Sequence, residues 1–205
     1  MNTAMRGLLR GVIVAALAAA LAFGGFALVS WLDGGERQEA GIGEVSIGGP
    51  YSLTDQEGRS VTDKDFRGKL QLVYFGFTSC PDICPTALQT VAIALDEMGV
   101  AAAEQVVPIL ITVDPERDTV AAMKEYVQSF HDRMVGLTGT PEQIAAVAKA
   151  YRVYYQKVKL PNSSLDYSVD HSGFLYLMSR DGKYVAHFRH NATPEEIAKR
   201  VKAAL

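Results

Sequence analysis

Cysteine is scarce in this sequence, and no charge of either sign is in strong excess. The chain of 205 residues contains two cysteines and has a formal net charge of −3. Two cysteines are too few for a scaffold stapled by disulfides or for a structural zinc site with four thiolates. The slightly acidic balance lacks the basic footprint of a nucleic-acid-binding protein, so we expect no nucleic-acid partner. The cysteines are therefore expected to act as a pair.

Charged residues are also absent from 11–32, which is apolar throughout. As a helix this run would be about 33 Å long, enough to cross the hydrocarbon core of a bilayer. Arg6 and Arg10 precede it, while Asp33 and Glu36 follow it. Positive charge before a span favours a cytoplasmic N-terminus. We therefore expect one transmembrane helix with the rest of the chain outside the cytoplasm.

The alternative for this segment is a cleaved signal peptide, because Ala20-Leu21-Ala22 resembles a cleavage site. The anchor is favoured, since the apolar run is longer than the core of about 7–15 residues in a signal peptide. Only residues 1–10 precede the span, which leaves no room for a mitochondrial presequence. The expected location is a bacterial inner membrane, single-pass, with the C-terminal domain in the periplasm.

The remaining chain is expected to form one domain over 46–205, joined to the anchor by a linker over 33–45 that is rich in glycine and charge. Apolar runs and helical spacing alternate along it. Strands are predicted over 70–77 and 106–113, hairpins over 51–61 and 174–188, and helices over 86–98, 119–130, 140–151 and from 193 onward. This alternation predicts an α/β fold. A cysteine pair that follows the first central strand and precedes a helix is the thioredoxin-like arrangement, with three layers around a central mixed β-sheet.

Cys80 and Cys84 are separated by three residues, one more than in a thioredoxin oxidoreductase. Pro81 and Pro85 restrict the loop. With Pro85 as the first helical residue, Cys84 would lie at the edge of a helix N-terminus, which favours a thiolate. Two soft thiolates select Cu(I), Zn(II) or Hg(II). Spacing alone leaves a structural disulfide or two buried thiols as alternatives, because exported cysteines often oxidise.

Three runs resemble the Sco/SenC family of copper chaperones and occur in the family's order. They are CPDICP at 80–85, ITVDPERDT at 111–119, and VDHS at 169–172 with FLYL directly beyond Gly173. The resemblance extends from about Ile47 to the C-terminus. It implies that Cys80 and Cys84 are thiolate ligands of copper and that His171 is an imidazole ligand. An imidazole added to two thiolates makes a site acceptable to Cu(II) as well as Cu(I).

The resemblance further implies a metallochaperone, rather than an enzyme, that delivers copper to the CuA centre of cytochrome c oxidase subunit II. Delivery would occur by exchange of thiolate and imidazole ligands. A periplasmic copper donor or a thiol reductant would be a further partner. Asp82 and Asp170 are candidates for contacts with a partner or for support of the ligands, although each also reads as a solvated loop carboxylate.

The competing function is that of a thiol–disulfide oxidoreductase that keeps target cysteines reduced through Cys80 and Cys84. It gives His171 no role. A thiol peroxidase would need a threonine and a proline where this chain has Phe77 and Val73.

The other motifs carry less weight. His131 reads as a solvated residue after a helix, and His187 and His190 are weaker copper candidates. The run 113–119 is interpreted as scaffold, with a turn at Asp114 and a cap before the next helix.

Overall fold

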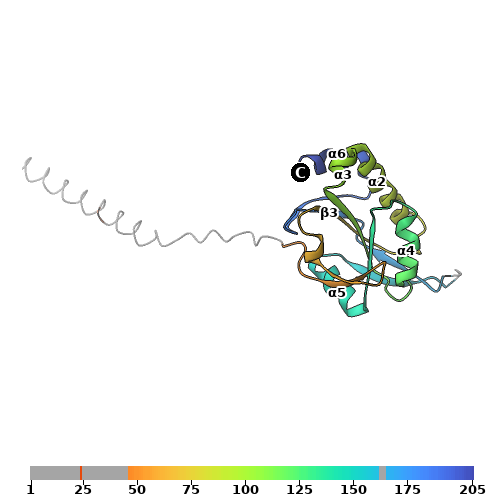
Figure 1. The fold of residues 1–205 in the computed structure, drawn as a ribbon. Coiled ribbons are helices and arrows are strands. Elements are labelled where there is room, and N and C mark those ends of the chain that lie inside the picture. The colour runs from red at the N-terminus through yellow and green to blue at the C-terminus, as the bar shows by residue number, and fades with distance from the viewer. Residues whose placement is uncertain (1–23, 25–45, 162–164) are drawn as a thin grey trace, which may run out of the picture. The chain divides into compact units, whose positions relative to one another are not determined.

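The computed structural model describes Gly24, residues 46–161 and residues 165–205. Apart from Gly24, the predicted anchor over 11–32 and the linker over 33–45 lie outside the described residues. Within the described part of the chain, no helix is long and apolar enough to cross a membrane. Ser46–Leu205 forms one compact unit, which Figure 1 draws mainly in colour.

A seven-stranded mixed sheet forms the centre of this unit, in the order β2-β1-β5-β4-β3-β8-β9. The strands are β1 Ser52–Asp55, β2 Ser60–Thr62, β3 Leu70–Gly76, β4 Val106–Thr112, β5 Val135–Thr138, β8 Leu175–Met178 and β9 Tyr184–Phe188. β3, β4 and β5 run parallel, while the flanking pairs are antiparallel. All seven residues of β3 are buried. A parallel strand covered on both faces reads as a continuous apolar run, which is why the sequence predicts it.

Helices cover both faces of this sheet, and the side chains of β3 identify the face on which α2 lies and the face on which α5 lies. They are η1 Asp63–Phe66, α2 Ile83–Met98, α3 Val100–Ala103, α4 Val120–Gln128, α5 Pro141–Ala150 and α6 Pro194–Lys202. Tyr74 of β3 pairs with Leu110 of β4, and the side chains of both residues lie on the face of the sheet that α2 covers. Phe75 points to the opposite face, where its ring lies 5.2 Å from that of Tyr151, the residue that directly follows α5.

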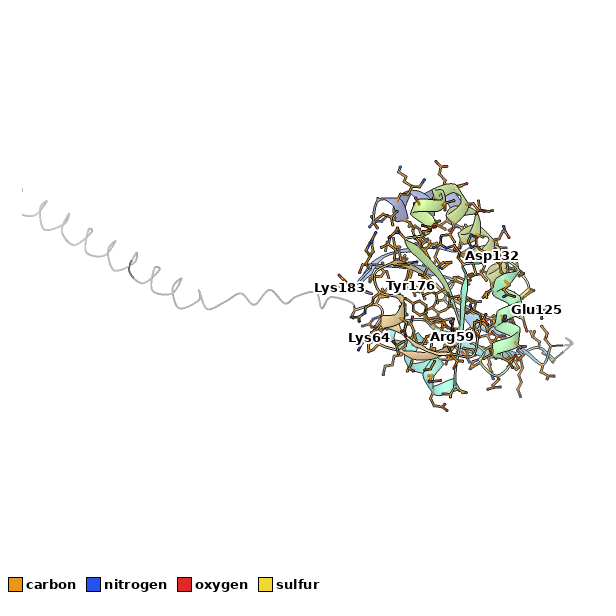
Figure 2. All side chains as sticks on the ribbon, in the orientation of Figure 1. Arg59, Lys64, Glu125, Asp132, Tyr176 and Lys183 are labelled. Atoms are coloured by element: carbon orange, nitrogen blue, oxygen red, sulfur yellow. The ribbon has the colours of Figure 1, made fainter. Side chains whose placement is uncertain are left out.

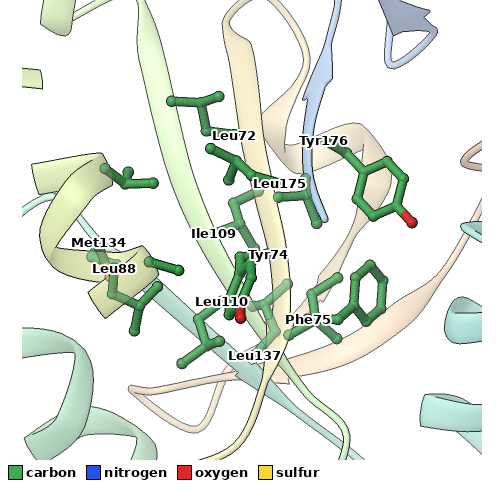
Figure 3. Close-up of a cluster of buried hydrophobic side chains, with 14 of the residues drawn as sticks. Leu72, Tyr74, Phe75, Leu88, Ile109, Leu110, Met134, Leu137, Leu175 and Tyr176 are labelled. Carbon is green, nitrogen blue, oxygen red and sulfur yellow. The ribbon is translucent and has the colours of Figure 1, made fainter. Parts of the chain in front are cut away.

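The core therefore lies in two layers, one on each side of β3 and β4. Figure 3 shows Phe75 and Tyr176 together and Leu88 of α2 away from them. Charged side chains such as Lys64, Lys183 and Glu125 lie at the periphery in Figure 2. The mixed α/β, thioredoxin-like architecture predicted from the sequence is confirmed.

Two helix starts agree closely with the sequence. The Thr140 side chain accepts a hydrogen bond from the backbone N–H of Gln143, and Thr193 does the same for Glu196. In both helices the side chain of Gln143 or Glu196 accepts a hydrogen bond from the backbone N–H of the threonine in return, which makes a capping box. Both helices also have proline at the first helical position, where its missing N–H is not needed. The predicted hairpin over 51–61 is confirmed as β1 and β2.

The sequence prediction missed three strands. β5 is short, and the pair β6 Tyr155–Lys159 and β7 Tyr167–His171 forms a separate two-stranded sheet. Four of the five residues of β6 are exposed, so it has no apolar pattern to detect. This hairpin carries His171 at the end of β7, so the predicted ligand lies on a strand and not in a loop.

Candidate metal centre

Cys80 lies in the loop between β3 and α2, where its backbone N–H donates to the carbonyl of Phe77 at 3.2 Å. Cys84 is the second residue of α2 and is fully buried. The helix predicted over 86–98 is α2, which begins at Ile83, so Pro85 lies in its first turn and not at its first position. Proline is tolerated there because the first N–H groups of a helix have no intrahelical partner. Cys84 is buried in the core, whereas Cys80 is partly exposed.

His171 reaches the cysteines from a segment 87 residues further along the chain. Its Nε2 lies 3.4 Å from Cys84 Sγ, and its Nδ1 lies 3.2 Å from the carbonyl oxygen of Ser172. A carbonyl oxygen only accepts, so Nδ1 faces a partner that suits an N–H donor. Nε2 faces the sulfur atoms, which is the position that a metal-binding nitrogen needs.

Two aromatic rings hold the imidazole in place. The ring of Phe77 meets that of His171 edge-on at 5.8 Å, and the ring of Tyr74 does so at 6.1 Å. The Tyr74 hydroxyl also lies 4.0 Å from Cys84 Sγ. The sequence analysis assigned neither ring to the site, although both lie in the apolar run directly before Cys80.

The structure thus brings together the three residues that the sequence singled out. The ligand atoms of Cys80, Cys84 and His171 all lie within 4.8 Å of one another. In the part of the chain that the structure describes, this is the one group of three or more histidine, cysteine or acidic residues arranged to hold a metal. Neither cysteine is in a disulfide, and two sulfur ligands with one imidazole form a donor set suited to copper.

The two sulfur atoms differ in protonation. Hydrogen bonds from the Cys84 thiol and the Cys84 backbone N–H lower the pKa of Cys80 to about 4. The hydrogen bond that Cys84 gives to Cys80, together with burial, raises the pKa of Cys84. Cys80 is therefore the thiolate and Cys84 the thiol, the reverse of what a helix-edge position for Cys84 suggested.

A cavity of about 440 Å³ opens beside the cysteines, lined by Phe77, Cys80, Pro81, Asp82, Ile83, Ser168, Val169, Asp170, His171, Gly173 and His190. Asp82 and Asp170 are exposed on its wall, and their carboxylates are not among the grouped ligand atoms, although the backbone of Asp82 hydrogen-bonds Cys80. The structure therefore gives these two acids a place at the mouth of the site. It also places His190, a weaker copper candidate from the sequence, on the wall of the cavity, outside the group of three ligand atoms.

The other two histidines lie away from the ligand group. His131 Nδ1 accepts the backbone N–H of Arg133, and its Nε2 lies 3.8 Å from an Asp96 carboxylate oxygen. His187 Nδ1 lies 2.6 Å from the hydroxyl of Tyr184. Each ring nitrogen named here has a local partner, so neither histidine is placed to bind the metal at Cys80.

Comparisons with known proteins agree with this geometry. The SCO1/SenC family model matches residues 39–205. The SCO1 homolog 1 of Arabidopsis thaliana mitochondria is 49% identical over 155 residues, which are 76% of this chain and 46% of that protein. This chain thus spans less than half the length of that relative.

Solved structures agree in fold. The copper-bound structure of Bradyrhizobium japonicum ScoI matches with a TM-score of 0.72 and 49% identity, over 78% of this chain and all of that one. BsSco, described as carrying a disulfide switch and as a member of the Sco family of cytochrome c oxidase assembly proteins, matches with a TM-score of 0.59 and 27% identity. That match covers 78% of this chain and 93% of the other.

Proposed function

This chain belongs to the SCO1/SenC family, and we propose that it binds copper through Cys80, Cys84 and His171 and takes part in cytochrome c oxidase assembly. The convergence of the three ligand atoms within 4.8 Å carries the proposal. The similar ScoI structure with bound copper supports it, as does the description of BsSco as an oxidase assembly protein. The finer proposal is delivery of the ion to the CuA centre of subunit II.

Cys80, Cys84 and His171 each have a different role in copper delivery. Cys80 offers a thiolate at the open cavity, whereas Cys84 is buried and must lose its proton when it binds copper. His171 presents Nε2 as the third ligand. A thiolate of the target enters through the cavity and displaces these ligands one at a time. Copper passes by ligand exchange, without release and without a change of oxidation state.

The ligand set suits both oxidation states of the cargo. Two thiolates bind Cu(I), and the added imidazole extends binding to Cu(II). We propose that the domain works in the periplasm of a bacterium, beside a membrane-bound oxidase, with the segment over 11–32 as its anchor. A periplasmic donor would load it and a reductant would keep Cys80 and Cys84 as thiols.

Copper titration of the reduced full chain tests the binding. We expect one tightly bound Cu(I) per chain by competition with a chelator, and a sulfur-to-Cu(II) charge-transfer band in the Cu(II) form. Cys80→Ser or Cys84→Ser should each abolish tight binding. His171→Ala should keep Cu(I) but weaken Cu(II) and its band, because only Cu(II) depends on the imidazole.

His187→Ala is the matched control, since it removes a histidine outside the ligand group. It should leave both copper forms unchanged. Full copper affinity in either cysteine variant, or an unchanged Cu(II) band in His171→Ala, would remove that residue from the site. Delivery is tested by mixing the copper-loaded chain with a reduced soluble CuA domain and following the CuA spectrum. No transfer to that domain would contradict the finer proposal.

Thiol–disulfide exchange is the second candidate function, favoured by the low pKa and partial exposure of Cys80. The Cys80 thiolate would attack a target disulfide and form a mixed disulfide. Cys84, after losing its proton, would then release the target as two thiols and leave a Cys80–Cys84 disulfide. Two electrons from an external dithiol would be needed to reset the pair.

The two candidates separate in the His171→Ala and Cys84→Ser variants. A reductase should keep its rate in His171→Ala, and Cys84→Ser should trap a mixed disulfide with the target domain. A chain without tight copper but with rapid disulfide exchange would favour the reductase.

A further inference from the structure

The two halves of the site belong to different sheets. The cysteines follow β3 of the central sheet, whereas His171 ends β7 in the two-stranded sheet. Among the described strands, β6 and β7 pair only with each other. Three residues join His171 to β8, which pairs with β3, but no ladder hydrogen bond ties β7 itself to the central sheet. Side-chain contacts therefore add to the chain connection in setting the distance from the imidazole to the thiolates. Residues 114–118, within the run 113–119 interpreted as scaffold from the sequence, lie between the two halves. We call residues 114–118 the bridging loop.

One end of the bridging loop holds the cysteine loop. The fully buried carboxylate of Asp118 accepts hydrogen bonds from the backbone N–H of Thr78 at 3.1 Å and from its hydroxyl at 2.6 Å. It also accepts from the Thr112 hydroxyl at 2.6 Å, at the end of β4. Thr78 stands two residues before Cys80, so Asp118 fastens the start of the cysteine loop to the central sheet.

The other end of the bridging loop holds the strand that carries the histidine. The buried carboxylate of Asp114 accepts from the Tyr167 hydroxyl at 2.8 Å and from Arg117 Nε. Arg117 Nη1 in turn donates to the backbone carbonyl of Tyr167 at 3.0 Å. Its guanidinium lies 3.9 Å from the centroid of the Tyr167 ring. Tyr167 begins β7, the strand that ends at His171.

Arg117 also reaches the rings that surround the imidazole. Its guanidinium carbon lies 5.9 Å from the centroid of Phe77, and the Phe77 ring packs edge-on against His171. A planar guanidinium holds two partners in fixed directions, which a lysine ammonium cannot do. Arg117 is thus the one side chain in the bridging loop that contacts both the base of β7 and the aromatic neighbour of His171 among the described contacts.

We propose that Arg117 and Asp114 are positioning residues for His171, while Asp118 separately positions the thiolates. The proposal rests on copper binding at this site. Its consequence is that the bridging loop sets the affinity for Cu(II) relative to Cu(I), because only Cu(II) depends on the imidazole. Loss of a residue that orients a metal ligand typically costs 10–100-fold in affinity.

The test compares Arg117→Met, which keeps the aliphatic stem, with Arg117→Lys and Tyr167→Phe in the full chain. We expect Arg117→Met to lower Cu(II) affinity about 10–100-fold and to move its charge-transfer band toward that of His171→Ala. Cu(I) affinity should stay within about threefold. Arg117→Lys should recover part of the loss. Tyr167→Phe removes only the hydroxyl that donates a hydrogen bond to Asp114. It should lower Cu(II) affinity by a smaller factor than Arg117→Met does.

Arg180→Met is the matched control. Arg180 also donates to backbone carbonyls, those of Gly68 and Leu205, but at the end of β3 remote from the cysteines. It should leave both copper affinities unchanged. Hydrogen exchange of the copper-free chains gives a second measure: amides of β7 should exchange faster in Arg117→Met, and those of β3 should not.

The outcomes separate this proposal from the proposed function. If the wild-type chain bound no copper, the function would fail, and hydrogen exchange would still decide whether Arg117 holds β7. Equal losses of Cu(I) and Cu(II) affinity, or a wild-type Cu(II) band with unchanged β7 exchange in Arg117→Met, would overturn the positioning role. If Arg117→Met does not fold, the ratio of Cu(II) affinity to Cu(I) affinity in Tyr167→Phe and Arg117→Lys provides the test. An unchanged ratio in both variants would overturn the positioning role.

Discussion

Gly76 is the residue at which a single methyl group should disturb both the core and the metal site. It ends β3, and a Cβ built there would lie 3.0 Å from Cys84 Sγ, 2.9 Å from Tyr74 Cε1 and 3.4 Å from Leu110 Cδ1. Carbon atoms in good contact are about 3.5–4.0 Å apart, so the first two neighbours must each move by about half an ångström. Neither has free space, because Tyr74 and Cys84 are buried.

The expected cost of Gly76→Ala follows from two opposing effects. Overpacking a core typically costs about 1–3 kcal/mol. Gly76 does not have a left-handed φ, so alanine adds no backbone strain there. Alanine also restricts the unfolded chain, which stabilises the folded state by about 0.4–1 kcal/mol. The net loss in the free energy of unfolding should be about 1.5 kcal/mol, or a fall of about 3–6 °C in Tm for a domain of this size.

The same shift moves a copper ligand, because Cys84 Sγ is one of the atoms displaced. A binding geometry must be held within about 0.5 Å, so we expect Cu(I) affinity to fall about tenfold. Gly173→Ala is the control: Gly173 lines the cavity beside the cysteines, but a Cβ there would lie 3.6 Å from His190 Cβ, an ordinary contact. Thermal unfolding and chelator competition measure both effects. An unchanged Tm and copper affinity in Gly76→Ala, or equal effects at both glycines, would refute the reasoning.

Two further predictions concern thiol chemistry and helix capping. Because the pKa of Cys80 is about 4, its alkylation rate in the reduced chain should be nearly constant from about pH 5.5 to about pH 7.5, whereas an ordinary thiol would speed up about 100-fold. Mass spectrometry should find Cys84 unmodified, and Cys84→Ala should restore a steep pH dependence at Cys80; a steep profile in the wild type would contradict the assignment of the thiolate. Thr140→Ala removes the side chain that accepts from the Gln143 backbone N–H, so it should cost about 1 kcal/mol in unfolding without changing copper affinity. A cost near zero would mean that this cap contributes nothing.

Local sequence patterns predicted the central part of the fold. β3 and β4 are continuous apolar runs because they are parallel strands covered on both faces. The capping boxes at Thr140 and Thr193 mark helix starts through contacts within one turn. These features depend on neighbours in the chain, so the sequence displays them directly.

Other elements depend on partners that are distant in the chain. β6 is mostly exposed and polar, and it is a strand only because it pairs with β7 across the residues between them. The start of α2 at Ile83, and not at Pro85, depends on how Cys84 packs into the core. A local pattern does not contain that information.

The sequence alone predicted that two cysteines, with three residues between them, follow a buried strand, and its motifs pointed to His171 as their partner. The tertiary structure decided how they meet. It brought Nε2 of His171 within 3.4 Å of Cys84 Sγ across 87 residues, and it made Cys80 the thiolate through the hydrogen bond that the buried Cys84 donates to it. Ligand distances and proton positions depend on long-range packing and on burial, because a charge is costly in the core and stable beside donors at its edge.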